Sequence, residues 1–213
     1  MTKFERVVVI SLGRRRDRLW AFLDRFLEAW PGTPLRLFTA VDGSQEALPD
    51  GWRGTAGAWG CARSHEAVVA QALTDGVERL LVLEDDATFV PGFAERLAGL
   101  RIPGTCQMLY LGGEHLLPPQ PVWPGLVLGR NVNRTHAYAI LGRPALETIR
   151  EHLRWHPARW TAAHNVDHQL GILHETARVA VYAADPWMCG QAAGRSDIDG
   201  REWPARAWER QVD

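Results

Sequence analysis

Short runs of consecutive apolar residues alternate with amphipathic stretches along most of the chain. Residues 7–12 are rich in β-branched side chains, which is typical of a strand buried on both faces. Residues 35–41 and 80–83 have the same character, and each run predicts a further strand. Between these strands, residues 17–30 and 61–73 place apolar side chains at helical spacing, so each predicts a helix.

The second half of the chain continues this alternation, with less regular segments. We predict strands at 108–111, 137–141 and 178–182, and helices after Pro91, at 144–153 and at 166–174. The Gly- and Pro-containing segments 44–60 and 116–129 predict loops, the second with at most one edge strand, and no periodicity follows Trp187. Alternating strands and helices predict an α/β fold with a mainly parallel central sheet. No linker or repeat divides the sequence, so we expect one domain over 1–213, in which 187–213 forms a loop or tail.

Composition excludes several functional classes. The 24 basic and 25 acidic residues leave a formal net charge of -1, so bulk charge provides no basis for binding nucleic acid, and we expect no such partner. The three cysteines are widely spaced and form no CxxC pair, which favours free thiols in a reducing compartment. We find no secretory or membrane-spanning segment, and we therefore expect a cytoplasmic protein.

An acidic cluster follows the strand predicted at 80–83. Glu84, Asp85 and Asp86 come directly after its apolar residues, at the edge of the sheet where α/β proteins bind ligands. Crowded carboxylates repel one another unless a cation compensates them, and hard oxygen ligands select Mg²⁺ or Mn²⁺. The cluster therefore indicates a divalent metal site, although a solvated acidic turn has the same sequence.

Several ordered motifs resemble glycosyltransferase family 25, the group of lipopolysaccharide and collagen galactosyltransferases. The first strand with Arg15 and Asp17-Arg18, the segment 38–43, and the acidic cluster are similar to motifs of that family. Further similar fragments follow in the family's order: Gly57, Gly60-Cys61, Ser64-His65, Tyr110-Leu111-Gly112-Gly113, Thr135-His136-Ala137-Tyr138, Val166-Asp167, Gln191 and Ser196-Asp197-Ile198. The set covers nearly the whole chain, and no single fragment is specific.

This resemblance implies a GT-A-type, Rossmann-like domain in which Glu84, Asp85 and Asp86 replace the metal-binding DxD motif. It further implies a UDP-sugar donor carrying galactose or glucose, Mn²⁺ or Mg²⁺ as cofactor, and inversion at the anomeric carbon. The acceptor would be a hydroxyl of a saccharide, a lipid-linked saccharide (glycolipid) or a peptide.

Asp167 is the predicted catalytic base, which the reaction needs in order to deprotonate the acceptor hydroxyl. It matches an acidic position of the family and lies near a predicted helix start. An acidic residue in the first turn of a helix is also favoured by the helix dipole alone, so a structural role stays open.

The donor site is predicted from residue types as well as from the resemblance. Arginines after the first strand suit a diphosphate, glycines allow a close approach of the backbone, and Asp42 suits ribose or uracil. The resulting donor set is Arg15, Arg18, Asp42, Gly57, Gly60, Ser64, His65, Asp85, Gln191 and Arg195. Each has an ordinary structural alternative: a solvated helix start for the arginines, an Asp-Gly turn for Asp42, loop flexibility for the glycines, and a buried helical histidine for His65.

Two other functions remain open. A Mg²⁺-dependent phosphoester or nucleotide-sugar hydrolase shares the acidic strand end, and a catalytically degenerate scaffold would retain the donor site without transfer. Tryptophans and arginines near the C-terminus, such as Trp203 and Arg206, are compatible with peripheral contact with an inner membrane, and equally with a packed terminus.

Overall fold

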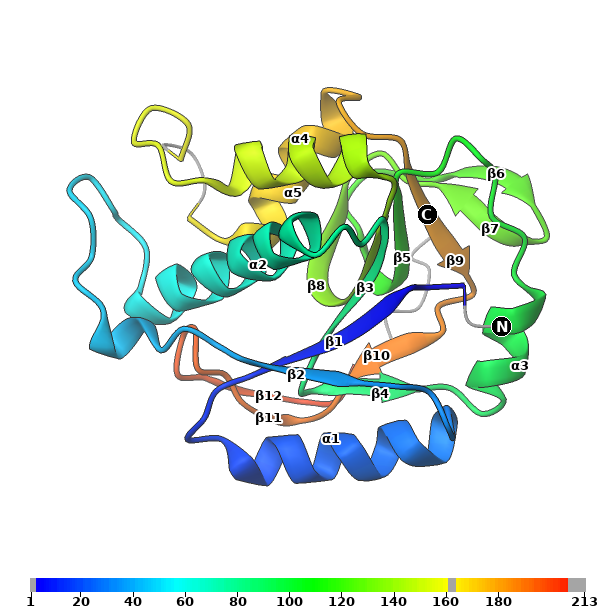
Figure 1. The fold of residues 1–213 in the computed structure, drawn as a ribbon, viewed down its shortest axis with the longest axis horizontal. Coiled ribbons are helices and arrows are strands. Elements are labelled where there is room, and N and C mark those ends of the chain that lie inside the picture. The colour runs from blue at the N-terminus through cyan, green and yellow to red at the C-terminus, as the bar shows by residue number, and fades with distance from the viewer. Residues whose placement is uncertain (1–2, 161–163, 207–213) are drawn as a thin grey trace.

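The computed structural model describes residues 3–160 and 164–206, and a sheet of eight strands lies at its centre (Figure 1). The part of the expected tail at 207–213 lies outside the described residues. Along the sheet the strand order is β2-β1-β3-β8-β5-β9-β7-β6. The strands are β1 (Arg6–Ser11), β2 (Arg36–Thr39), β3 (Arg79–Glu84), β5 (Met108–His115), β6 (Gln120–Trp123), β7 (Gly125–Leu128), β8 (Val132–Leu141) and β9 (Val181–Asp185).

Most strands of this sheet point in one direction. β1 is parallel to β2 and β3, and β5 is parallel to β9. β8 is antiparallel to both β3 and β5, while β7 is antiparallel to both β9 and β6. Only β7 and β8 therefore oppose the other strands of the sheet. This arrangement confirms the predicted α/β fold with a mainly parallel central sheet.

Helices cover both faces of the sheet (Figure 1). α2 (Ala56–Thr74), α4 (Arg143–Leu153) and α5 (Val166–Glu175) lie on one face, and α1 (Arg16–Ala29) lies on the other, where α3 (Phe93–Gly99) joins the same core. Successive side chains of a strand point to opposite faces. Val7 and Val9 accordingly pack with Phe22 of α1, while Val8 and Ile10 belong to the core beneath α2.

The chain passes to opposite faces on either side of β1. Helix α1 connects β1 to β2 on one face, and α2 then connects β2 back to β3 on the other face. Such a divergence of connections opens a crevice beyond the carboxyl ends of the strands. The residues after β1 and β3 therefore lie at the edge where this fold class binds ligands.

Two small sheets bring residues 189–206, which we call the C-terminal segment, to that edge. β4 (Ala87–Phe89), just after the acidic cluster, pairs antiparallel with β10 (Cys189–Gln191). β11 (Gly194–Arg195) and β12 (Glu202–Trp203) then form a short hairpin. In the region after Trp187, which lacks sequence periodicity, pairing with β4 therefore holds β10 beside the acidic cluster.

Some boundaries differ from the sequence predictions. α2 begins at Ala56, inside the predicted loop 44–60, because the Thr55 hydroxyl caps it by accepting from Ala58 N at 3.0 Å. The same loop begins with the 3₁₀ turn η1 (Gly43–Gln45). The predicted loop 116–129 contains the hairpin β6–β7, and β9 begins three residues later than the predicted strand 178–182. β5 continues through Gly112 by means of register shifts.

Among the described residues, every helix is too short or too polar to cross a bilayer.

Candidate functional site

A cavity of about 790 Å³ opens at the carboxyl ends of β1 and β3. Its walls come from the start of α1, the 40–43 segment, the first turns of α2 and α5, and the C-terminal segment. The predicted site residues that line it are Arg15, Arg18, Asp42, Gly57, Ser64, His65, Glu84, Asp85, Asp86, Asp167, Gln191 and Arg195. Gly60 does not line it; an added Cβ there would lie 2.4 Å from the Val41 carbonyl oxygen. Gly60 thus serves the packing of α2 against the 40–43 segment.

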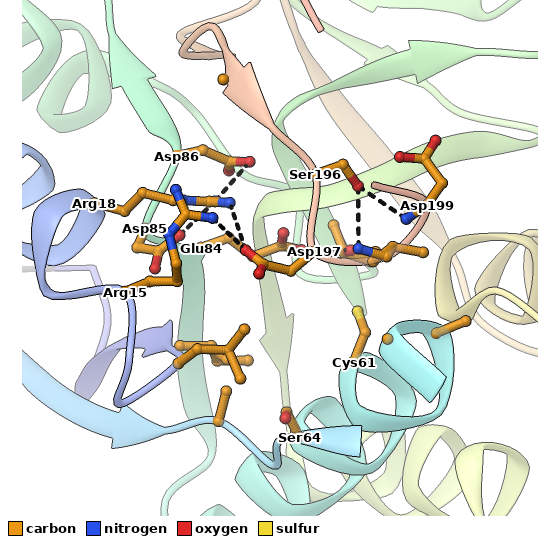
Figure 2. Close-up of a pocket in the computed structure, with 18 of the residues that line it drawn as sticks. Arg15, Arg18, Cys61, Ser64, Glu84, Asp85, Asp86, Ser196, Asp197 and Asp199 are labelled. Carbon is orange, nitrogen blue, oxygen red and sulfur yellow. Dashed lines mark hydrogen bonds and ion pairs between the residues drawn. The ribbon is translucent and has the colours of Figure 1, made fainter. Parts of the chain in front are cut away.

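Asp85 and Asp86 share one arginine. The Arg18 guanidinium pairs with Asp85 and lies 2.9 Å from Asp86 Oδ2, as Figure 2 shows. Ser11 at the end of β1 donates to Asp85 Oδ2 at 2.7 Å. Burial, followed by the neighbouring charge of Glu84, raises the pKa of Asp86 to about 7, and Arg18 opposes this rise. We call Asp85 and Asp86 the acidic centre. Arg18 compensates only part of its negative charge.

Glu84 faces the opposite side of the sheet, toward α2. Its Oε1 accepts from the Thr135 hydroxyl at 2.6 Å and lies 3.3 Å from His65 Nε2. His65 Nδ1 in turn lies 2.9 Å from the Tyr138 hydroxyl. Burial alone would raise the pKa of Glu84, but the hydrogen bond and charge of His65, with Thr135, lower it to about 2. Glu84 is therefore an ionised carboxylate held by a buried polar network.

The acidic centre has the chemistry that a hard divalent cation needs. Asp86 Oδ1 is buried and has no hydrogen-bond partner within the described part of the chain. A buried carboxylate oxygen without a donor is costly, and a cation would compensate it. Asp85 and Asp86 therefore fit the predicted metal, and Glu84 contributes its charge from the α2 side. The metal assignment itself stays a prediction.

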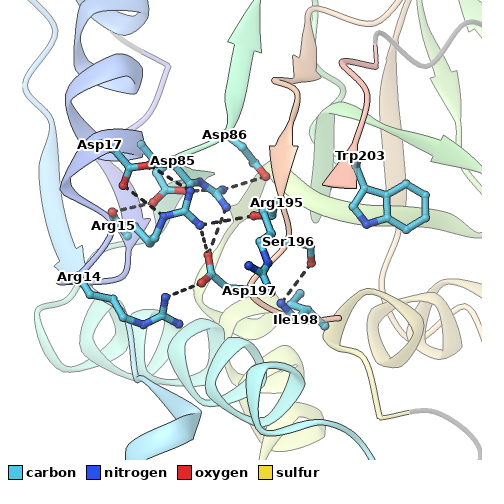
Figure 3. Close-up of polar contacts among 12 residues, drawn as sticks. Arg14, Arg15, Asp17, Asp85, Asp86, Arg195, Ser196, Asp197, Ile198 and Trp203 are labelled. Carbon is cyan, nitrogen blue, oxygen red and sulfur yellow. Dashed lines mark hydrogen bonds and ion pairs between the residues drawn. The ribbon is translucent and has the colours of Figure 1, made fainter. Parts of the chain in front are cut away.

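Three arginines at the start of α1 converge on one carboxylate of the C-terminal segment. Asp197 accepts from Arg14 Nη1 at 2.6 Å and from Arg15 Nη1 at 2.5 Å (Figure 3). It also lies 3.7 Å from Arg18 Nη1. Arg14 also donates to Asp42 at 2.9 Å, and hydrogen bonds from Ser44 and Arg14 lower the pKa of Asp42. We call Arg14, Arg15 and Arg18 the arginine cluster. It adjoins the acidic centre through Arg18.

The C-terminal segment lies across the cavity and is held at both of its sides. Ala192 N donates to the Asp86 carbonyl at 2.7 Å, and Gln191 Nε2 lies 3.4 Å from Asp86 Oδ2. On the α2 side, the Thr55 hydroxyl donates to the Ile198 carbonyl at 2.7 Å. A Cβ on Gly57 would lie 2.1 Å from the Asp197 carbonyl oxygen, so glycine permits this approach.

Asp167 lies in the first turn of α5 and lines the cavity, as the prediction of a helix start requires. Its Oδ1 accepts from the backbone N–H of His168 at 2.9 Å. The carboxylate is half-buried, and its charge is among those that raise the pKa of the Cys61 thiol. A carboxylate therefore faces the cavity from the wall formed by α5, and its role as a base stays a prediction.

Sequence reasoning missed several polar side chains that hold this arrangement together. Ser11 and Thr135 bind carboxylates of the acidic cluster, Thr55 binds the C-terminal segment, and Arg14 is the third member of the arginine cluster. Ser11 interrupts an otherwise apolar run at the end of a strand, a signal that was available. Thr135 lies in a fragment that resembles the family, but its partner Glu84 is 51 positions away and the sequence does not show that contact.

Known proteins resemble this chain in sequence. The sequence model of glycosyltransferase family 25 (LPS biosynthesis protein) matches residues 4–111. A human protein named inactive glycosyltransferase 25 family member 3 is 31% identical over 161 residues, which is 64% of this chain and 27% of that protein. A rat protein named probable inactive glycosyltransferase 25 family member 3 is 31% identical over 163 residues, covering 64% of this chain and 28% of that protein. The chain thus spans little more than a quarter of these relatives.

Among solved structures, a glycosyltransferase involved in the glycosylation of the major capsid of PBCV-1 superposes with a TM-score of 0.49. The two share 11% sequence identity, and the superposition covers 84% of this chain and 80% of that one. A likeness this distant carries no argument about function.

An α/β sheet with an acidic strand end, together with the sequence match, defines the class of this protein as a glycosyltransferase. The chain belongs to glycosyltransferase family 25.

Proposed function

We propose that the cavity binds a UDP-hexose and that the chain transfers galactose or glucose, with inversion, to a hydroxyl of a saccharide, lipid-linked saccharide or peptide. One observation carries this proposal: an acidic centre and an arginine cluster meet at Arg18 in a single cavity. A metal–diphosphate donor carries a positive metal ion and a negative diphosphate. The carboxylates match the metal ion, and the guanidinium groups match the diphosphate. Family membership supports the same assignment.

The donor diphosphate would lie between the two groups. Asp85 and Asp86 would hold Mn²⁺ or Mg²⁺, and Glu84 would add negative charge nearby. When bound, the metal would neutralise charge that develops on the departing UDP. Arg15 and Arg18 would bind phosphate oxygens, because a guanidinium presents several donors in a fixed plane. Asp42 would accept from ribose or uracil.

Asp167 would act from the opposite wall as general base. It would accept the proton of the acceptor hydroxyl as the bond between the sugar and the diphosphate breaks. The hexose would occupy the space between the acidic centre and α5.

A second candidate is a nucleotide-sugar-binding protein without transfer activity. The matched relatives are named inactive, and Arg18 already bridges Asp85 and Asp86 as a built-in cation. In that case the arginine cluster would bind the nucleotide without need of a metal.

An assay of UDP release separates these functions. The chain would be incubated with UDP-galactose or UDP-glucose and Mn²⁺, with and without a panel of simple saccharide acceptors, and with EDTA as control. Release that depends on both acceptor and metal would support transfer. Release without any acceptor would support a hydrolase, and donor binding without release would support the inactive protein.

A further inference from the structure

A second group of metal-binding side chains lies in the same cavity, on the α2 side. Cys61 and His65 are four residues apart on α2, so their side chains share one face of the helix. Glu84 reaches the same point from the end of β3. The ligand atoms of these three residues all lie within 4.8 Å of one another. Within the described ranges 3–160 and 164–206, this is the one such group of three or more.

The spacing within this group suits a single tetrahedral ion. His65 Nε2 and Glu84 Oε1 are 3.3 Å apart. Two ligands bound at about 2.0–2.1 Å on a tetrahedral zinc ion lie roughly 3.3–3.4 Å apart, since the tetrahedral angle fixes their separation. The histidine and the carboxylate therefore already have the separation that shared coordination requires.

Hydrogen bonds orient two of these three side chains. In the structure His65 Nε2 faces Glu84 Oε1, and a bound ion would take the place of the Nε2 proton. The ring proton would then lie on Nδ1, where the Tyr138 hydroxyl, 2.9 Å away, can accept it. Thr135 donates to Glu84 Oε1 at 2.6 Å and fixes that carboxylate. His65 and Tyr138 are both fully buried, so this orientation does not depend on a mobile surface side chain.

We propose that Cys61, His65 and Glu84 bind one zinc-class divalent ion, with the fourth coordination position open to the cavity. A thiolate, an imidazole and a carboxylate select Zn²⁺ or Co²⁺ over the hard ions Mg²⁺ and Mn²⁺. All three residues line the cavity, and Figure 2 shows the Cys61 sulfur pointing away from α2 on the side of the acidic residues.

This site shares only Glu84 with the predicted donor-metal residues Glu84, Asp85 and Asp86, and its thiol and imidazole differ from them in chemistry. Asp85 and Asp86 are bound by Arg18 on the α1 side and offer only oxygen ligands. Because Cys61 and His65 are not among the predicted donor-metal residues, zinc binding does not depend on the proposed transferase activity.

Cobalt titration of the full chain tests the site directly. Co²⁺ bound to a thiolate has a sulfur-to-metal charge-transfer band in the near ultraviolet, which oxygen and nitrogen ligands do not produce. We expect this band to saturate at one Co²⁺ per chain and to disappear when Zn²⁺ is added. Cys61→Ser should abolish it, whereas Cys106→Ser should retain it, because Cys106 is a buried thiol outside the cavity.

Two further variants complete the test. Asp86→Asn removes a predicted donor-metal ligand and should leave the thiolate band intact, so the two metal sites are distinguished. Tyr138→Phe removes the partner of His65 and should weaken Zn²⁺ affinity by about 10-fold while keeping the band. Absence of the band in the wild-type chain at saturating Co²⁺, or its persistence in Cys61→Ser, would overturn the proposal. Circular dichroism of each variant establishes that it is folded.

Discussion

Arg15 Nη1 lies 2.5 Å from Asp197 Oδ2, although the two residues are 182 positions apart in the chain. Both side chains are about one-fifth exposed, so the ion pair lies at the edge of the cavity and not in its interior. The Asp197 carboxylate therefore pairs with the same guanidinium groups that a donor diphosphate would need. Under the proposed function, the C-terminal segment and the donor would compete for the arginine cluster.

Replacing Asp197 by asparagine should tighten binding of UDP in the absence of metal. The substitution removes the anion that now neutralises the arginine cluster, and a gain on the order of tenfold is expected from charge-assisted hydrogen bonds of this strength. Isothermal titration of UDP into the two proteins measures it. Asp24→Asn makes the same charge change at an exposed position of α1 and should leave affinity unaltered. Weaker UDP binding by Asp197→Asn would show that the carboxylate supports the nucleotide site.

Gly57→Ala should loosen the C-terminal segment. The added Cβ would lie 2.1 Å from the Asp197 carbonyl oxygen and 2.7 Å from Ile198 Cα, so the backbone there must move. Hydrogen exchange should become faster across residues 194–200. Gly99→Ala is a matched control, because nothing lies within 4 Å of its added Cβ. Unchanged exchange in Gly57→Ala would mean that the segment is not packed on α2 in solution.

Asp86→Asn should stabilise the metal-free protein at alkaline pH. The folded-state pKa of Asp86 is raised to about 7, above its ordinary value of 3.8, so the ionised form opposes folding. That penalty is fully present above pH 7 and is relieved as pH falls through 7 toward 3.8. Urea unfolding in EDTA should show that the variant gains free energy of unfolding on the order of 1 kcal/mol at pH 8. This is about the value of a single pKa unit, less than the full shift, because the side chain is partly solvated. The gain should shrink at pH 5; a loss of stability at pH 8 would contradict this account.

Asp167→Asn should separate chemistry from binding. Loss of a general base lowers kcat by about 10²–10⁴-fold, whereas donor affinity should change little. UDP release under single-turnover conditions, beside UDP titration, measures both quantities. Glu147→Gln removes a carboxylate from an exposed position on α4 and serves as control. Transfer at the wild-type rate would exclude Asp167 as the base.

The fold was predictable where burial leaves a local pattern. β1, β3 and α1 follow from apolar runs and helical spacing, and the acidic cluster follows from its place after β3. The pairing of β4 with β10 joins Ala87 to Gln191, so no local pattern reports it. The start of α2 was mistaken for a loop because its glycines suggested flexibility. Gly57 and Gly60 are instead required where α2 packs against neighbouring backbone.

The predicted site residues converge for a related reason. Strand ends meet at one edge of a mainly parallel sheet, so polar residues placed after β1 and β3 become neighbours. The sequence does not show which way each carboxylate turns. Glu84 and Asp86, two positions apart, have different partners: His65 and Thr135 bind Glu84, while Arg18 contacts Asp86. These orientations depend on α2, β8 and α1 together, and local sequence does not specify them.

The central claim is a donor site for a metal–nucleotide sugar, and a thermal-shift panel of nucleotide sugars with and without Mn²⁺ tests it most directly. A ligand that binds only the folded state raises the melting temperature according to its affinity. We predict that a UDP-hexose stabilises the wild-type chain when Mn²⁺ is present, and that the Mn²⁺-dependent part of this stabilisation is lost in Asp86→Asn. No shift with any saturating nucleotide sugar, with or without metal, would contradict the donor-site assignment.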